Sequence, residues 1–237
     1  MKKDKYFLTC ERYYIFEFLI MAAGMMGAYT YIIRGGVFSN AQTANIMMMA
    51  IGFGKGEGLK GAYYLIPAGA YILGTVFSEL LPKKVRKTGI LRWDTLLIGF
   101  ELLVLIIVGL IPTRVPNQVV QIMISFICAM QYNTFRQAQG INMATTFVTN
   151  HVRQVGVSIA NILKHRDDME AREKGKRHLF MLIMFFLGAL ILAALCPILQ
   201  EKAIWLAVLP MGVCFSMLLH ADLTDEKDLL ENVPGGH

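Results

Sequence analysis

The sequence predicts an all-α polytopic membrane protein: about six transmembrane helices plus two re-entrant or broken helices, arranged as an inverted internal repeat. Of the 237 residues, 55% are hydrophobic and 17% are charged, whereas a soluble domain carries about a quarter charged residues. The apolar residues fall in blocks separated by short basic segments. This composition excludes a disordered chain, a disulfide-rich secreted domain and a soluble nucleotide-binding enzyme.

Six apolar stretches are long enough to span a bilayer, because a helix needs about 20 residues to cross ~30 Å of hydrocarbon. We predict spans at residues 15–33, 59–81, 95–111, 118–135, 178–199 and 203–220. The first stretch follows a basic N-terminus but is too long for the apolar region of a signal peptide. It also lacks a convincing cleavage site before Arg34, so we expect an uncleaved span.

Two further stretches, residues 35–54 and 140–163, are apolar but broken by polar side chains, and either a re-entrant or a fully spanning path fits them. Loop charge decides between the two paths, because Lys and Arg in short loops stay on the cytoplasmic side. With both stretches re-entrant, sixteen of the 23 Lys and Arg lie on one side. With both spanning, the basic loop 83–92 would lie outside. We therefore predict six spans in the cytoplasmic (inner) membrane, with both termini in the cytoplasm.

The order of elements occurs twice within a single membrane domain of residues 1–237. Repeat 1 covers approximately residues 13–112, and repeat 2 covers approximately residues 117–221. Each reads as span, broken segment, span, span, and GAYIL at residues 69–73 resembles GALIL at residues 188–192. Three crossings per half require the halves to be inverted, as in many transporters. Residues 222–237 follow as an acidic cytoplasmic tail.

Each broken segment begins with a bend and continues as a half-helix. In the first, Gly35 and Gly36 permit the bend, Ser39 or Asn40 caps the helix, and residues 41–50 follow. In the second, Gly140 is the bend, and Thr145 or Thr146 is the cap. We expect the two helix N-termini to face the middle of the protein, where their free N–H groups suit an anion or a polar neutral solute.

The side chains expected to bind a solute are mostly neutral hydrogen-bonding groups, which favours recognition over hydrolysis. They are Ser39, Asn40, Gln42, Thr43, Asn45, Gln131, Asn133, Thr145, Thr146, Thr149, Asn150 and His151. The alternative is that they only cap helices and tie the spans together.

Four charged residues are candidates for coupling or charge recognition. Glu17 lies about half a turn inside its span and Glu101 about one and a half turns. Either can carry a proton, or can reach an interface and pair with a base. Arg136 can neutralise an anionic solute or anchor the chain at the membrane surface. His151 can titrate near neutral pH, and Arg153 lies on another face of the same helix.

The sequence predicts no metal, cofactor or catalytic residue. The four cysteines are far apart, and no Cys-x-x-Cys pair occurs. The 15 methionines form no ladder with Cys or His partners in the outer loops, as a Cu(I) site requires. The spans also lack the GxSxG, HExxH and paired-aspartate motifs of hydrolases. We therefore expect a protein that is not an enzyme.

Two motifs carry a resemblance to a known family. They are GGVFSNAQTAN at residues 35–45 and MQYNTFRQAQGINMATTFVTN at residues 130–150. They are similar to motifs of the YoaK-like family of bacterial inner-membrane proteins, a domain of unknown function with six predicted spans. The sequence differs from that family at Ala44 and Asn150, where the family has Gly. The resemblance covers essentially the whole chain and implies an integral membrane protein without an established substrate.

These observations predict a small secondary transporter or facilitator of a polar or anionic solute in the bacterial inner membrane. A channel of the same architecture, and a membrane scaffold or accessory protein without transport activity, remain as alternatives. The expected partners are the lipid bilayer and a small solute, and a homo-oligomer is compatible with the pattern. Nucleic acid is not expected, because the excess of 6 positive charges is explained by topology.

Overall fold

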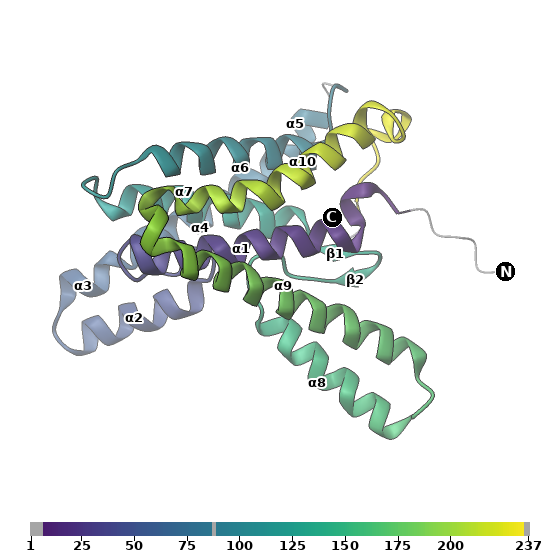
Figure 1. Cartoon of the computed structure of the whole chain (residues 1–237), viewed down its shortest axis with the longest axis horizontal. Coiled ribbons are helices and arrows are strands. Elements are labelled where there is room, and N and C mark those ends of the chain that lie inside the picture. Colours follow the sequence, from purple (N-terminus) through teal and green to yellow (C-terminus); the bar gives the residue numbers. More distant parts are fainter. Residues whose placement is uncertain (1–6, 87–88, 235–237) are drawn as a thin grey trace.

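The computed structural model describes residues 7–86 and 89–234, which fold almost entirely into helices (Figure 1). Residues 1–6, with three of the basic residues counted as cytoplasmic, lie outside the described residues. The α-helices are α1 (Tyr13–Ile33), α2 (Gln42–Gly54), α3 (Gly58–Tyr63), α4 (Leu65–Leu80), α5 (Pro82–Arg86), α6 (Trp93–Leu110), α7 (Asn117–Thr134), α8 (Thr149–Lys164), α9 (Met169–Leu199) and α10 (Val208–Leu223). Shorter elements join them: η1 (Thr9–Glu11), β1 (Gln137–Ala138), β2 (Ile141–Asn142), η2 (Gln200–Ala207) and η3 (Lys227–Leu229).

Several helices have the length and composition of membrane spans. Among the described residues, four stretches meet both criteria: Tyr13–Ile33, Gly58–Arg86, Trp93–Leu110 and Met169–Leu223. The last stretch contains both α9 and α10, which η2 joins at Gln200, a residue with a φ of 51°. The fold is therefore that of an all-α membrane protein. The count of six spans stays a prediction.

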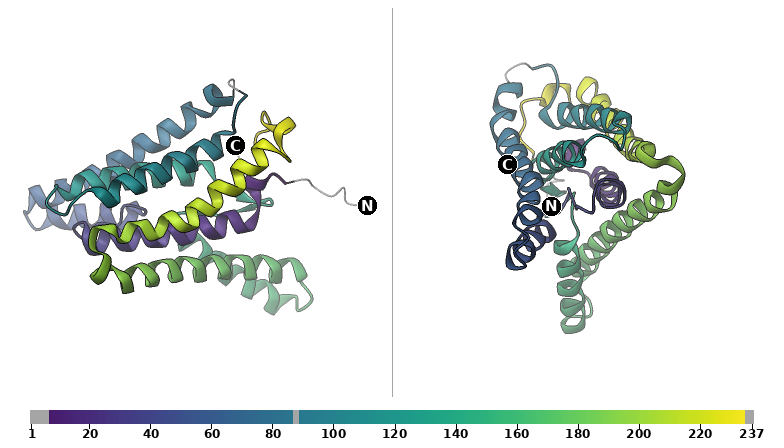
Figure 2. Two further views of the ribbon diagram at one scale, coloured as in Figure 1. Left: turned by 45° about the horizontal axis from the view of Figure 1, so that its top comes forward. Right: turned by 90° about the vertical axis from the view of Figure 1, so that its left-hand side faces the viewer.

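Helix α1 lies in the middle of the bundle, and α9 runs along one side of it (Figure 2). Gly24 of α1 packs against the backbone carbonyl of Phe185 in α9, and Gly188 of α9 packs against the carbonyl of Met21. A side chain at either glycine would collide with that carbonyl. The two backbones can approach this closely because both positions are glycine, as at many helix contacts in membranes.

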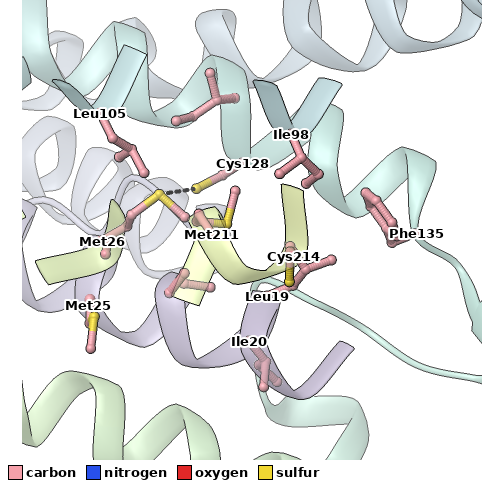
Figure 3. Close-up of a cluster of buried hydrophobic side chains, with 14 of the residues drawn as sticks. Leu19, Ile20, Met25, Met26, Ile98, Leu105, Cys128, Phe135, Met211 and Cys214 are labelled. Atoms are coloured by element: carbon pink, nitrogen blue, oxygen red, sulfur yellow. Dashed lines mark hydrogen bonds between the residues drawn. The ribbon is translucent and has the colours of Figure 1, made fainter. Parts of the chain in front are cut away.

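A second close pair consists of α4 and α7, where Gly74 packs against the carbonyl of Phe126. Helices α6 and α10 contact each other beside α1. Between α1, α6, α7 and α10 lies an apolar core in which Met26, Leu105, Cys128, Met211 and Cys214 are buried (Figure 3). The flexible methionines fill the space between the helices.

Helices α2 and α8 are short, and they run from the middle of the molecule toward opposite ends (Figure 1). Helix α2 is followed by α3 at one end, and α8 packs against α9 at the other. The bend before α2 is the predicted one, since Gly35 and Gly36 have φ angles of 88° and 72°. These values are typical of glycine because it has no Cβ.

The bend before α8 differs from the expected one. Gln139 and Gly140, with φ angles of 47° and 83°, form the tight turn between β1 and β2. Two central residues with positive φ match the twist of a two-residue hairpin. The helix then begins only at Thr149, after an irregular segment, so Gly140 is a hairpin turn rather than the immediate start of a half-helix.

A buried ion cluster lies at the end of the bundle that holds the described part of the C-terminal tail. The Arg92 guanidinium lies 3.3 Å from Asp94 and 3.9 Å from Asp222, and all three side chains are at most 5% exposed. The backbone N–H of Arg92 also donates to Asp222 at 2.9 Å. We call Arg92, Asp94 and Asp222 the end cluster. Glu226 continues it by accepting from the backbone N–H and the hydroxyl of Thr9.

Candidate functional site

The segments that precede α2 and α8 meet in the interior. The amide group of Asn40 donates one hydrogen bond to the carbonyl of Thr146 at 2.9 Å and another to that of Ala23 at 3.2 Å. Asn40 lies over Gly27 of α1, where a methyl group would stand 2.8 Å from the amide nitrogen. The two predicted half-helices are therefore joined near their beginnings by a direct hydrogen bond.

Helix α7 adds a third side chain to this meeting point. The amide nitrogen of Gln131 donates to the carbonyl of Thr145 at 3.1 Å. Ser39, Asn40, Gln131, Thr145 and Thr146 are each at most 2% exposed. We call these five residues the central polar cluster.

The central polar cluster contains oxygens whose hydrogen-bonding capacity is unused. Within residues 7–86 and 89–234, no hydrogen-bond partner is found for four of them: Ser39 Oγ, Asn40 Oδ1, Gln131 Oε1 and Thr145 Oγ1. The phenol of Tyr71, in α4, faces the hydroxyl of Thr146. Buried polar groups in native proteins usually have partners, and each exception calls for an explanation. Four such exceptions lie in one place here.

The predicted caps of α2 do not cap it. The N-cap position is Ala41, and no side chain accepts a hydrogen bond there. Asn40 lies one residue before the N-cap, and its amide nitrogen donates to two carbonyls instead. Gln42 and Asn45 instead bind the preceding segment: Gln42 donates to Ser39 O at 3.2 Å, and Asn45 donates to Phe38 O at 3.0 Å.

The predicted caps of α8 are also displaced. Val148 occupies the N-cap position, three and two residues after Thr145 and Thr146, because α8 starts later than expected. Thr149 is exposed at the start of this helix, as Thr43 is on α2. These two motif threonines therefore lie apart from the central polar cluster.

His151 is buried on α8 and contacts a second histidine that the sequence analysis did not single out. Its Nδ1 lies 2.8 Å from Nδ1 of His178 in α9, and its Nε2 lies 2.8 Å from the carbonyl of Ala144. A carbonyl only accepts, so Nε2 of His151 carries a proton, and in the neutral pair His178 Nδ1 donates to His151 Nδ1. The pair joins α8 to α9, and Ala144, whose carbonyl His151 contacts, directly precedes Thr145 of the central polar cluster.

The outer face of α8 holds Arg153, which is exposed and donates to the side-chain oxygen of Asn150 at 3.3 Å. The opposite orientations of His151 and Arg153 agree with the prediction that they occupy different faces. Arg153 therefore has no contact with the buried cluster, and Asn150 lies between the two environments as a half-buried residue.

A polar cavity of about 480 Å³ lies at the end of α7 and reaches Ala144, the residue before Thr145. Asn133 and Arg136 line it. Arg136 pairs with Glu79 of α4 and donates to Asn133 Oδ1 at 2.8 Å, and Asn133 donates to Ser78 at 2.8 Å. Arg136 is thus tied to an acidic partner at the mouth of this cavity, which we call the vestibule.

The two acidic candidates differ in their surroundings. Glu17 is half-buried in the first turns of α1, on the side of Arg177, which fits the alternative of pairing with a base. Glu101 is fully buried, eight residues after the start of α6 and so near its middle. Neither carboxyl oxygen of Glu101 has a hydrogen-bond partner among the described residues, and Cys128 and Cys214 lie nearby. Glu101 is therefore deeper than its sequence position suggested.

Two residues near the site escaped the sequence analysis, His178 and Tyr71. His178 was read only as the first residue of a span, and Tyr71 as one of its apolar residues. A histidine at a span boundary is a weak signal, and nothing local shows that it meets His151. Among the described residues, no group of three or more His, Cys, Asp or Glu lies together in a way that would hold a metal ion.

The helices and the buried polar meeting point define the class, an all-α membrane protein with a polar centre. A family model described as "Protein of unknown function (DUF1275)" matches residues 15–217, and the chain belongs to this family. The predicted membership of an uncharacterised family is thus confirmed, whereas the YoaK-like name stays a prediction. No curated protein and no solved structure matches the chain.

Proposed function

We propose that the protein is a small secondary transporter or facilitator of a small polar solute in the bacterial inner membrane. One observation carries the proposal: the segments that lead into α2 and α8 meet in the interior, in a cluster with unused hydrogen-bonding oxygens. Transporters commonly bind substrate near the midplane, at discontinuous helices related by an inverted repeat.

The pattern of helix contacts supports an inverted repeat of six spans. If α1, α2, α4 and α6 correspond to α7, α8, α9 and α10, the close pair α1 with α9 corresponds to α7 with α4. The contact of α2 with α4 likewise corresponds to that of α8 with α9, and α6 meets α10 across the pseudo-axis. In this arrangement α2 and α8 are re-entrant.

The proposed topology places both termini in the cytoplasm. Helix α5, the start of α6, the β1–β2 hairpin and the segment that follows α10 lie toward the same end of the bundle (Figure 1). The basic segments 83–92 and 164–177 belong to that end in this arrangement, as the positive-inside rule requires.

The burial of the central polar cluster favours a transporter over a permanently open channel. Its five residues are at most 2% exposed, so no open pore passes along them. The vestibule stops at Ala144, and a separate, mainly apolar groove of about 360 Å³ between α1 and α9 reaches Asn40. This arrangement suits an occluded state between two openings.

Cysteine accessibility tests the proposal. Thr145→Cys would be labelled with a membrane-impermeant maleimide in right-side-out and in inside-out vesicles, beside the exposed control Thr149→Cys. The native thiols give a low background, because all four cysteines are buried. Burial, followed by the charge of Asp94, also raises the pKa of the Cys10 thiol well above its usual value, which keeps it in the unreactive protonated form.

A transporter predicts slow labelling of Thr145→Cys from both sides, as the site opens alternately. Rapid labelling from both sides would favour the channel. No labelling from either side, with Thr149→Cys reacting normally, would contradict transport and favour a scaffold. In the same vesicles, Lys84→Cys should react only in inside-out preparations, and the reverse result would overturn the six-span topology.

A further inference from the structure

The orientation of two buried amides specifies the chemistry of the solute. Both amide hydrogens of Asn40 point to carbonyl oxygens, those of Ala23 and Thr146. Carbonyls only accept, so a flipped amide would place two acceptors face to face. The side-chain oxygen of Asn40 must therefore point away from both carbonyls, and it has no partner among the described residues.

Gln131 repeats the arrangement from α7. Its amide nitrogen donates to the carbonyl of Thr145, and its side-chain oxygen is buried without a partner in the described part of the chain. The hydroxyls of Ser39 and Thr145 can either donate or accept. The central polar cluster consequently offers more acceptors than donors to whatever occupies it.

The charge around these oxygens argues for an uncharged occupant. An anion offers only acceptors and would face the amide oxygens, and no Lys or Arg belongs to the central polar cluster. A cation would suit those oxygens, but the cluster contains no carboxylate, and the positive ends of α2 and α8 begin close by. A neutral molecule with N–H or O–H groups can donate to the amides and turn its own oxygen toward the helix ends.

We infer that the solute is a small uncharged hydrogen-bond donor, a carboxamide or a polyol, held by Asn40 and Gln131 through their side-chain oxygens. This inference rests on the proposed transport function and narrows it. The vestibule agrees with it, because its lining is rich in neutral amides such as Asn133, Asn142 and Asn150. Arg136, which also lines it, is paired with Glu79.

The test uses three probes of nearly the same shape and different charge: acetamide, acetate and acetamidinium, with glycerol as the polyol. Their entry into proteoliposomes containing the full chain would be followed by stopped-flow light scattering and compared with protein-free liposomes. We expect the protein to accelerate acetamide, glycerol or both at least tenfold, and neither ion measurably. If acetamide enters faster than glycerol, the solute is a carboxamide. If glycerol enters faster, the solute is a polyol.

Two variants assign the effect to the cluster. Gln131→Leu removes one of the two acceptor oxygens and should lower the protein-dependent rate about tenfold, the effect of one lost hydrogen bond. Ser39→Ala removes a hydroxyl that no described residue binds, so it should fold normally and lower the rate several-fold. Gln200→Asn, at an exposed glutamine whose positive φ asparagine also tolerates, is the control and should leave the rate unchanged.

Faster entry of acetate or acetamidinium than of acetamide would overturn the inference but leave transport intact. Rates equal to those of protein-free liposomes for all four probes would also overturn it. In that case, the labelling of Thr145→Cys decides separately whether the proposed transport function survives.

Discussion

The central polar cluster and the end cluster are both buried and polar, yet they are built on opposite principles. In the end cluster, Arg92 is paired with two carboxylates, and its guanidinium also donates to the carbonyl of Leu229. In the central polar cluster there is no charge, and four oxygens have no partner among the described residues.

This difference separates a structural polar network from a binding site. A satisfied network stabilises one arrangement of the chain, whereas a buried polar group without a partner costs stability. Such a cost persists in proteins where a ligand supplies the missing contacts. The end cluster thus fixes the N-terminal segment, α6 and α10 to one another. In the central polar cluster, the unpartnered oxygens are free to form hydrogen bonds with a ligand.

The largest effect should come from breaking the end cluster. Arg92→Met leaves Asp94 and Asp222 buried without their cation, which should lower the free energy of unfolding by about 3–5 kcal/mol. Although burial lowers it, the charge of Asp94 and of the other acidic neighbours raises the pKa of Arg92 above its usual value, so the cation is present at all ordinary pH values. Denaturant unfolding in detergent would measure the loss.

Lys84→Met is the matched control, since Lys84 is exposed in the neighbouring α5. Its stability should equal that of the wild type. Equal stability of Arg92→Met and Lys84→Met would show that the end cluster contributes nothing, and the contrast between the two regions would disappear.

The next largest effect should come from the histidine pair. His151→Ala leaves His178 Nδ1 buried without its partner and should cost about 1–3 kcal/mol. If the pair acts as a unit, the double substitution His151→Ala with His178→Ala should cost less than the sum of the single ones. His165→Ala, at an exposed histidine in the α8–α9 connection, is the control. Strict additivity in the same unfolding assay would argue against the contact.

A substitution at Glu101 tests whether a buried acid without a partner can be replaced without loss of stability, as we expect for the unpartnered groups of the central polar cluster. Glu101→Gln keeps the shape and removes a buried ionisable group that no described residue pairs, so stability should stay the same or rise by up to about 1 kcal/mol. If Glu101 carries a coupling proton, the variant should also lose any dependence of acetamide entry on a pH gradient. A clear loss of stability would indicate a structural partner for this carboxyl group.

The smallest effect on stability, and the sharpest contrast, is expected at Thr145. Thr145→Val keeps the side-chain shape and the backbone carbonyl that Gln131 binds, and removes only an unpartnered hydroxyl. The free energy of unfolding should change by less than about 0.5 kcal/mol, while the protein-dependent entry of acetamide falls several-fold. Thr149→Val, on the exposed face, should change neither quantity. If Thr145→Val lowers stability but leaves acetamide entry unchanged, the Thr145 hydroxyl has a structural role and not a role in solute binding.

Much of this site was predictable in kind from the sequence. The broken segments could be found because polar residues and glycines interrupt apolar stretches, and the bilayer tolerates such breaks only inside the protein. Ser39, Asn40, Gln131, Thr145 and Thr146 were all among the expected residues. Thr43 and Thr149 were expected with them, but they lie on exposed helix faces. A motif does not reveal which face of its helix meets the rest of the bundle.

The first residues of the helices were less predictable, because a side chain that can cap a helix can also form hydrogen bonds with other parts of the protein. Asn40 is a good cap by residue type, but its amide makes two hydrogen bonds across the bundle instead. Before α8, the Gln139-Gly140 turn forms a hairpin that delays the helix to Thr149. Local preference set the region of each bend, and tertiary contacts moved the first helical residue.

The sequence by itself determined that the chain is an apolar helical protein and in which regions its helices lie, because apolar stretch length and glycine backbone freedom are local properties. Only the tertiary structure decided that Asn40 contacts Thr146, 106 residues away, that His151 meets His178, and that Glu101 is buried at the middle of α6. Those outcomes depend on which helix faces pack together, and no local pattern fixes that choice. The unused oxygens at the centre, on which the proposed function rests, follow from the same packing.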